Sequence, residues 1–364
     1  MLEVISPIKP HTLKKIEIIT KYVDSWARKI LEFEGSLGLV YIDCMSNCGV
    51  YYDENNAEVE GTAIRVAKLL NQIAQNYPNK KVILYFNDLS PEKIDLLQER
   101  IKLLEFKDVQ IHYSKIDCNT FLKAFNLIEY KSYNTLMVYD PYEASIDWEA
   151  VSPFLKIWGE VIINHMTSDT KRGAALARKK EVIKKYEQTY MTDISNIITL
   201  GNNPEVLNKV VIDIIKTQTP SSTVFVSSFS FFNKNNGQLY HLIHCSKNIE
   251  GLKLFKKVVW NIFGDKSSLK NTHGKETQLS LFSQSGNIVC AETDEDCYTM
   301  QDVAKYVYEK YSSLPSVDLE TVYADLDRHP VFPSDGYKLK LKSELKLLYS
   351  VEIKKGNIYF KNRG

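Results

Sequence analysis

The sequence predicts a mixed α/β fold, with a doubly wound and mostly parallel sheet followed by a small C-terminal domain. Three observations support this prediction. Short apolar runs alternate with amphipathic stretches through the first part of the chain, which is the pattern of β-α-β units. Two strand-like runs then follow each other around a turn. The last part of the chain is helical before it ends in two short strands.

The first part contains five predicted strands and five predicted helices in strict alternation. The strands are apolar runs of four to eight residues, whereas the helices repeat apolar side chains every three to four residues. Ser90 before Pro91 marks one helix start, because serine caps helix N-termini and proline fits the first turn. The helices are expected at 11–34, 61–73, 91–104, 120–127 and 148–158, and the strands at 39–43, 81–87, 109–113, 135–139 and 160–164.

The second part completes the sheet and adds the C-terminal domain. Helices are expected at 170–186, 204–215 and 250–262, with strand-like runs at 223–232 and 238–244 between the last two. Residues 266–297 begin polar and turn-rich, so they are predicted to link a domain at 1–265 to one at 298–364. Three helices and a β-ribbon are the winged-helix plan: 300–311, 319–326, 338–349, and strands at 350–353 and 358–360.

Composition limits the classes of function. Lysine and arginine total 46 against 45 acidic residues, so any contact with nucleic acid or an anionic membrane must use a local patch. No apolar run approaches the roughly 20 residues that span a bilayer, and the N-terminus lacks a signal layout. The six cysteines are too sparse for a disulfide framework and indicate a reduced cytoplasm. Cys44 and Cys48 have no third cysteine at Tyr51, so small loop residues, rather than a metal site, are expected.

Acidic or amide side chains follow the predicted parallel strands. Ligands of doubly wound sheets lie outside the carboxyl ends of the strands. Asp88 is placed to bind a ribose diol, and Asp117 with Cys118 to face an adenine amino group. Helix N-caps also select aspartate, which is the alternative for Asp88 and Asp117. Five strand ends carry such groups: Asp43, Asp88, Asp117, Asp140 and Asn164.

Two motifs among these strand ends point to methyl transfer. Residues 39–51 form an apolar run, an acid and a loop of small residues, as in S-adenosylmethionine (SAM) methyltransferases with the pattern acid-x-Gly-x-Gly-x-Gly. Only the last glycine is kept, so Asp43, Asn47 and Gly49 are the expected cofactor residues. Asp140-Pro141-Tyr142 is similar to the Asp/Asn-Pro-Pro-Tyr of nucleic-acid amino-methyltransferases, in which the acid holds the target amine and the ring stacks on an extruded base. A turn with a buried tyrosine is the alternative.

The order of these motifs resembles the three-Cys-motif partner protein family over nearly the whole chain. The resemblance implies a class I methyltransferase fold with a late antiparallel hairpin, SAM as cofactor, and a neighbour-encoded partner with a radical-SAM-like three-cysteine motif, among bacterial mobile or defence genes. The chain differs at Cys44, Ser46, Asn47 and Cys48, where Gly, Ala, Gly and Pro are usual. The matching segments are 41–51 with 61–63, 88–92, 140–142 with 147–148, 162–164, 240–243, 251–252 and 260.

A basic stretch and the predicted wing are candidate nucleic-acid contacts. Residues 171–185 hold seven cations and one acid, and lysine and arginine clusters supply most non-specific affinity for phosphates. A solvated helix is the alternative. The candidate residues are Lys171, Arg172, Arg178, Lys179 and Lys180, with Lys354 and Lys355 of the wing.

Two hypotheses of function therefore compete. The first is a SAM-dependent methyltransferase that acts on a nucleic-acid amino group, with Asp140, Pro141 and Tyr142 at the reaction centre. The second is a catalytically degenerate adaptor that binds nucleic acid or the three-cysteine partner. The missing glycines favour the adaptor. The retained Asp140-Pro141-Tyr142 motif and the acidic residues at successive strand ends favour the enzyme.

Overall fold

The central element is a seven-stranded sheet, seen in a computed structural model that describes residues 4–157, 159–219, 224–270 and 297–360. The strand order is β5-β4-β1-β6-β7-β9-β8, and β9 runs in the direction opposite to the other six strands. The strands are β1 (Gly38–Asp43), β4 (Lys81–Asn87), β5 (Gln110–Ser114), β6 (Asn134–Tyr139), β7 (Gly159–His165), β8 (Phe225–Phe232) and β9 (Gln238–Ser246). The mostly parallel α/β sheet with its late hairpin confirms the predicted fold class in this coarse form.

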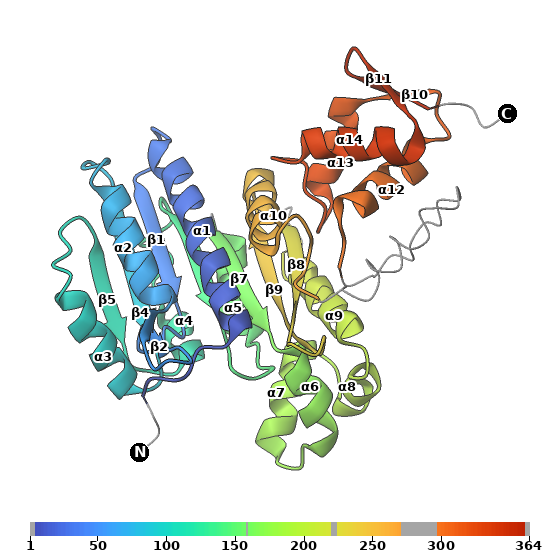
Figure 1. Ribbon diagram of the computed structural model, residues 1–364. Helices are drawn as coiled ribbons and strands as arrows, with labels where there is room; N and C mark the ends of the chain where they lie inside the picture. Colours follow the sequence, from blue (N-terminus) through green and yellow to red (C-terminus); the bar gives the residue numbers. More distant parts are fainter. Residues whose placement is uncertain (1–3, 158, 220–223, 271–296, 361–364) are drawn as a thin grey trace.

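Helices cover both faces of the sheet, as Figure 1 shows. One face is packed by α1 (Pro10–Glu32), α2 (Thr62–Ala74), α3 (Pro91–Lys102) and α10 (Ile249–Phe263). The other is packed by α4 (Cys118–Ala124), α5 (Trp148–Lys156), α7 (Lys180–Tyr190), α8 (Ile194–Leu200) and α9 (Pro204–Thr217). Along β1, Leu39 and Tyr41 face the first set, whereas Val40 and Ile42 face the second. This alternation explains why β1 reads as a continuous apolar run.

Three features of residues 44–200 differ from the sequence prediction, one of which is the unpredicted helix α8. The loop after β1 contains a hairpin of β2 (Val50–Tyr52) and β3 (Glu58–Glu60), whose turn is held by Asp53. The expected helix at 170–186 is instead α6 (Thr167–Gly173), a 3-10 turn at Ala174–Leu176, and α7. A Cβ atom on Gly173 would lie 2.3 Å from the hydroxyl of Tyr186, so Tyr186 of α7 packs directly over that glycine of α6.

The C-terminal part consists of α12 (Met300–Tyr311), β10 (Ser316–Asp318), α13 (Leu319–Arg328), α14 (Lys338–Tyr349), β11 (Glu352–Lys354) and β12 (Asn357–Tyr359). Its three strands form an antiparallel sheet in the order β10-β12-β11, of which β10 was not predicted. Most of the predicted linker, residues 271–296, lies outside the described residues, and the predicted domain boundaries stay a prediction.

A buried lysine of α10 joins this part to the rest of the chain. The Nζ atom of Lys256 donates to the carbonyl oxygens of Leu326, Asp327 and His329 at 2.7, 2.9 and 2.7 Å. These carbonyls lie at the C-terminal end of α13, where helix carbonyls lack partners of their own. The indole of Trp260 also donates to the Val331 carbonyl, at 2.9 Å. In addition to these hydrogen bonds, one continuous apolar cluster extends from the sheet across α10 into the C-terminal part.

Candidate cofactor and active site

Four polar side chains gather at the carboxyl ends of β1, β6 and β7, beneath the first turns of α1. The side-chain amide of Asn164 donates to Asp140 at 2.6 Å, and the Nζ atom of Lys15 forms an ion pair with the other oxygen of the same carboxylate. Asp43, on the neighbouring strand β1, is close enough to Asp140 to be raised in pKa by its charge. Sequence reasoning missed Lys15, because it lies 125 positions from Asp140.

Asp43 is a buried carboxyl group with few partners. It is 3% exposed, and its hydrogen bond in the structure comes from the Met45 N–H at 3.3 Å. Burial, followed by the charges of Asp140 and Asp88, raises its pKa to about 7, although the Met45 N–H and Lys15 oppose this. Two further buried polar atoms of the same region, the hydroxyl of Tyr41 and Oδ1 of Asn164, have no partner within the described residues. This edge therefore has spare hydrogen-bonding capacity.

The loop after β1 is fixed onto the end of β4. The Ser46 N–H donates to the Asn87 carbonyl at 2.8 Å, and the Asn87 amide donates to the Cys44 carbonyl at 3.0 Å. Asn47 has a positive φ of 56°, and its side-chain oxygen accepts the N–H of Cys48 at 2.9 Å. The side chains of Asn47 and Asn87 thus hold this loop in a turn. In methyltransferases of the expected pattern, glycines form the corresponding turn.

Asp88 is committed to this loop. Its two carboxylate oxygens accept the N–H groups of Asn47 and Ser90, each at 3.0 Å, and the residue is 5% exposed. The N–H of Ser90 belongs to the cap of α3, where the Ser90 hydroxyl accepts from Lys93 as predicted. Asp88 therefore links the β1 loop to the start of α3. A ribose hydroxyl could bind only to the lone pairs of this carboxylate that the two N–H groups leave free.

Gly49 serves packing and backbone conformation. Its φ is +77°, which favours glycine, and a Cβ atom there would lie 2.6 Å from Leu97 and 2.8 Å from Ile64. The residue lies against α2 and α3 rather than at an open surface. The glycine at this position of the methyltransferase pattern is thus explained without a ligand contact.

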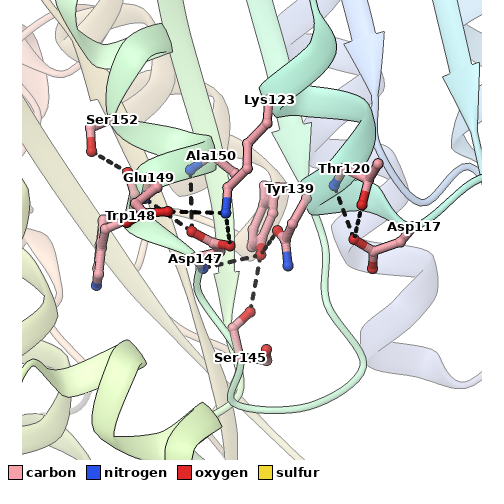
Figure 2. A network of polar contacts seen from close by, with 11 residues as sticks. Asp117, Thr120, Lys123, Tyr139, Ser145, Asp147, Trp148, Glu149, Ala150 and Ser152 are labelled. Atoms are coloured by element: carbon pink, nitrogen blue, oxygen red, sulfur yellow. Dashed lines mark hydrogen bonds and ion pairs between the residues drawn. The ribbon is translucent and has the colours of Figure 1, made fainter.

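Asp117 and Cys118 begin α4. The carboxylate of Asp117 accepts the backbone N–H of Thr120 at 3.0 Å and its hydroxyl at 3.1 Å, as Figure 2 shows. This is the helix-cap role that the sequence left open. Cys118 is buried near the Cys44 thiol, whose pKa is raised by burial first and by Cys118 second.

The cysteine pair of the β1 loop is separated by the sheet. Cys44 packs in the cluster of α4 and α5, whereas Cys48 packs in the cluster of α1 and α2 and donates to the Val50 carbonyl. Within the described residues, no group of three or more His, Cys, Asp or Glu side chains is placed to hold a metal ion.

The segment after β6 presents one buried and one exposed residue. Pro141 is buried, but Tyr142 is 67% exposed, and the Nζ atom of Lys93 lies 5.4 Å from the centre of its ring. The ring is thus placed at the surface beside Asp140. The arrangement differs from a turn with a buried tyrosine, and it leaves an aromatic face available for stacking.

The basic candidates are exposed but lie on different elements. Lys171 and Arg172 lie in the last turn of α6, Arg178 and Lys179 lie between the 3-10 turn and α7, and Lys180 begins α7. The Arg178 guanidinium donates to the carbonyls of Ala175 and Ala177, both at 3.0 Å. In the β11–β12 turn, Lys354 pairs with Glu352 and Lys355 has a φ of 50°.

Comparisons with known proteins gave only weak similarities. No protein-family model matches the chain, and no curated protein matches it significantly. Among solved structures, protein LPL1258 from Legionella pneumophila is similar at 13% identity and a TM-score of 0.39, over 68% of this chain and 92% of that one. An rRNA methylase from Streptococcus thermophilus is similar at 10% identity and a TM-score of 0.29, over 62% and 93% of the two chains.

A third solved structure is precorrin-6y C5,15-methyltransferase from Geobacter metallireducens, at 11% identity and a TM-score of 0.26, over 62% of this chain and 87% of that one. Scores this low carry no argument about activity, and the strand order itself identifies the fold. Among the helices in the described part of the chain, none is long and apolar enough to cross a membrane.

Proposed function

We propose that the carboxyl edge of the sheet binds SAM and that the protein is a methyltransferase. The observation that carries the proposal is Asp43, a buried carboxyl group at the end of β1. Among the described residues it accepts one hydrogen bond, from Met45, and a second acidic residue, Asp140, lies beside it. A buried acid with spare acceptors is best satisfied by a cation. SAM supplies two, its ammonium and its sulfonium groups.

The proposed reaction centre is Asp140 with Pro141 and Tyr142. Asp140 would accept the target amine, and the exposed ring of Tyr142 would stack on a base. Lys15 now occupies one oxygen of Asp140, so a target amine must displace or adjoin this lysine. The substrate that we propose is a nucleic acid, held by the exposed cations from Lys171 to Lys180.

The C-terminal part supports the same substrate class. Its order of helix, strand, two helices and two strands fits a winged helix, with α14 as the helix that would enter a groove and the turn at Lys354 and Lys355 as the wing. We therefore propose a winged-helix module. A three-cysteine partner protein remains a further proposal that rests on the sequence resemblance alone.

The adaptor is the second candidate, and the contacts of Asp88, Asp117 and Gly49 favour it. Each of these residues serves the fold: Asp88 holds the β1 loop, Asp117 caps α4, and Gly49 packs against α2. A chain that has filled its cofactor loop with internal contacts can keep the sheet as a scaffold and bind partners without catalysis.

Calorimetric titration with SAM and S-adenosylhomocysteine separates the two candidates. The enzyme hypothesis predicts binding to the full-length protein and a loss of about tenfold or more in affinity on Asp43→Asn. Asp117→Asn is the matched control, because asparagine caps a helix equally well while the charge is removed. No heat at about 100 μM protein places Kd above roughly 1 mM and favours the adaptor.

Transfer of a labelled methyl group from SAM to mixed DNA and RNA then tests catalysis. The wild-type protein is expected to label one of them, and Asp140→Ala is expected to abolish the label while SAM binding persists. Undiminished labelling by the variant would remove Asp140 from the mechanism.

A further inference from the structure

A cavity of about 700 Å³ opens at the opposite, amino edge of the same sheet. It lies between the last turns of α1 and the first turns of α10, above the starts of β6 and β7. Its walls include the apolar side chains of Trp26, Ile30 and Leu254, with Phe33 and Tyr133 nearer the surface. A volume of this size is in the range of small-molecule sites.

The floor of the cavity contains the carboxylate of Glu160, the second residue of β7. It accepts from the Tyr22 hydroxyl, from Nε2 of His244 at 2.9 Å and from the Ser246 hydroxyl at 3.2 Å. The side chain is only 12% exposed. Gly251 of α10 makes room for it, because a Cβ atom there would lie 2.5 Å from Oε1 of Glu160.

The charge of Glu160 is not balanced by an ion pair with any lysine or arginine in the described part of the chain. Nδ1 of His244 is buried without a partner among the same residues, so a proton there would be a buried N–H without an acceptor. The charges nearest the rim do not change this balance, because Lys29 pairs with Glu250 at 3.6 Å and Lys131 is exposed to solvent.

We propose that this amino-edge cavity is a binding site for a small organic amine with an aromatic or aliphatic body. The ammonium group would pair with Glu160 on the floor, and the body would lie against Trp26, Ile30 and Leu254. A desolvated carboxylate in an apolar-walled cavity favours a cation over a neutral or anionic molecule of the same shape. The site is separate from the carboxyl edge, and its existence does not require that SAM binds there.

Calorimetry of the full-length protein with three probes of similar shape tests the proposal. These are 2-phenylethylamine, 2-phenylethanol and phenylacetate, which differ in charge. The amine is expected to bind at least about tenfold more tightly than the alcohol, and the acid not at all. Equal affinities, or no binding of the amine up to about 10 mM, would overturn the proposal.

Variants then assign the site. Glu160→Gln is expected to remove the preference for the amine, and Glu250→Gln, which changes an exposed acid at the rim, to leave affinity within about twofold. If Glu160→Gln does not fold, Ile30→Trp fills the cavity without touching the Glu160 contacts and should abolish binding of the amine. Retained binding in Ile30→Trp, or loss of binding in Asp43→Asn instead, would place the amine elsewhere and refute the proposal.

Discussion

The Nζ atom of Lys15, on the helix that precedes the sheet, forms an ion pair with the carboxylate of Asp140 at the end of β6. The two side chains are only 12% and 27% exposed. Lys15 also lies 5.5 Å from the ring of Tyr240, whose hydroxyl donates to the His11 carbonyl. The first turns of α1 are thus tied to the edge of the sheet where the cofactor is proposed to bind.

Replacing Lys15 by methionine is expected to lower the free energy of unfolding by about 2 kcal/mol. Asp140 would remain half-buried without its counter-charge, a cost between those of an exposed and of a fully buried pair. Urea denaturation checks this, with Lys14→Met as the control, since Lys14 pairs with Glu17 at the surface. Equal effects of the two substitutions would show that the ion pair adds nothing.

The pH dependence of stability should reveal Asp43. Its pKa is about 7 in the folded protein against 3.8 as the ordinary value, so the folded state binds the extra proton between these pH values. The stability that the protonated Asp43 allows is therefore fully present below about pH 4. It is lost as the pH rises to 7, because the buried carboxyl group must then ionise in the folded protein. Asp43→Asn avoids this loss and should gain stability relative to wild type by an amount of the order of 4 kcal/mol between pH 4 and 8. Denaturant titrations across this range measure it, and a constant difference would contradict the prediction.

Asp88→Ala is expected to destabilise the protein by about 2–4 kcal/mol and to loosen the β1 loop. The N–H groups of Asn47 and Ser90 would lose their acceptor in a buried place. Hydrogen exchange should accelerate at Asn47 and Cys48. Asp95→Ala in α3, which removes an exposed pair with Lys115, should leave hydrogen exchange unchanged and stability within about 0.5 kcal/mol.

Lys256→Met is expected to weaken the attachment of the C-terminal part by about 2–4 kcal/mol. Three carbonyl groups at the end of α13 would lose their hydrogen-bond donor in a largely buried contact. The neighbouring Lys257→Met is the matched control, because Lys257 forms an exposed pair with Asp335 at 3.0 Å. Faster hydrogen exchange in α13 for the first variant only would support the role of Lys256, and identical exchange would exclude it.

Binding to duplex DNA, if it uses the basic segment, should fall when Arg178, Lys179 and Lys180 are changed to glutamate. The slope of log K against log salt should flatten by about 0.9 for each phosphate that the variant no longer neutralises. Lys102, Lys107 and Lys209 are exposed on other elements, and their reversal makes the same change in net charge. Fluorescence anisotropy at several salt concentrations compares the two triple variants. An equal loss of affinity in both would assign the effect to overall charge.

Local patterns predicted most of the fold. The 81–87 run became β4 with the same bounds, and the N-cap at Ser90 is present. The missed elements are short: β2, β3 and β10 have three residues each and α8 has seven, too few for a periodicity to show. The break between α6 and α7 is accompanied by the packing of Tyr186 over Gly173, a contact that helical periodicity does not reveal.

The candidate site was only partly visible in the sequence. Strand-end position identified Asp43, Asp140 and Asn164, because parallel strands bring their carboxyl ends together. The same rule selected Asp88 and Asp117, whose carboxylates accept backbone N–H groups in the structure. Spacing alone cannot separate an acid that faces a ligand from one that caps a helix. Lys15 and Glu160 owe their roles to the packing of α1 and α10 on the sheet.

Helix α1 is one continuous helix that extends from the carboxyl edge of the sheet to its amino edge. Lys15 lies near one end and Trp26 near the other, eleven positions along one helix of 23 residues, which is a distance of about 16 Å. A ligand at either edge would therefore lie against the same helix. If one ligand shifts α1 along its axis, the shift is carried to the opposite edge, and occupancy of either pocket would change the affinity of the other by the same factor.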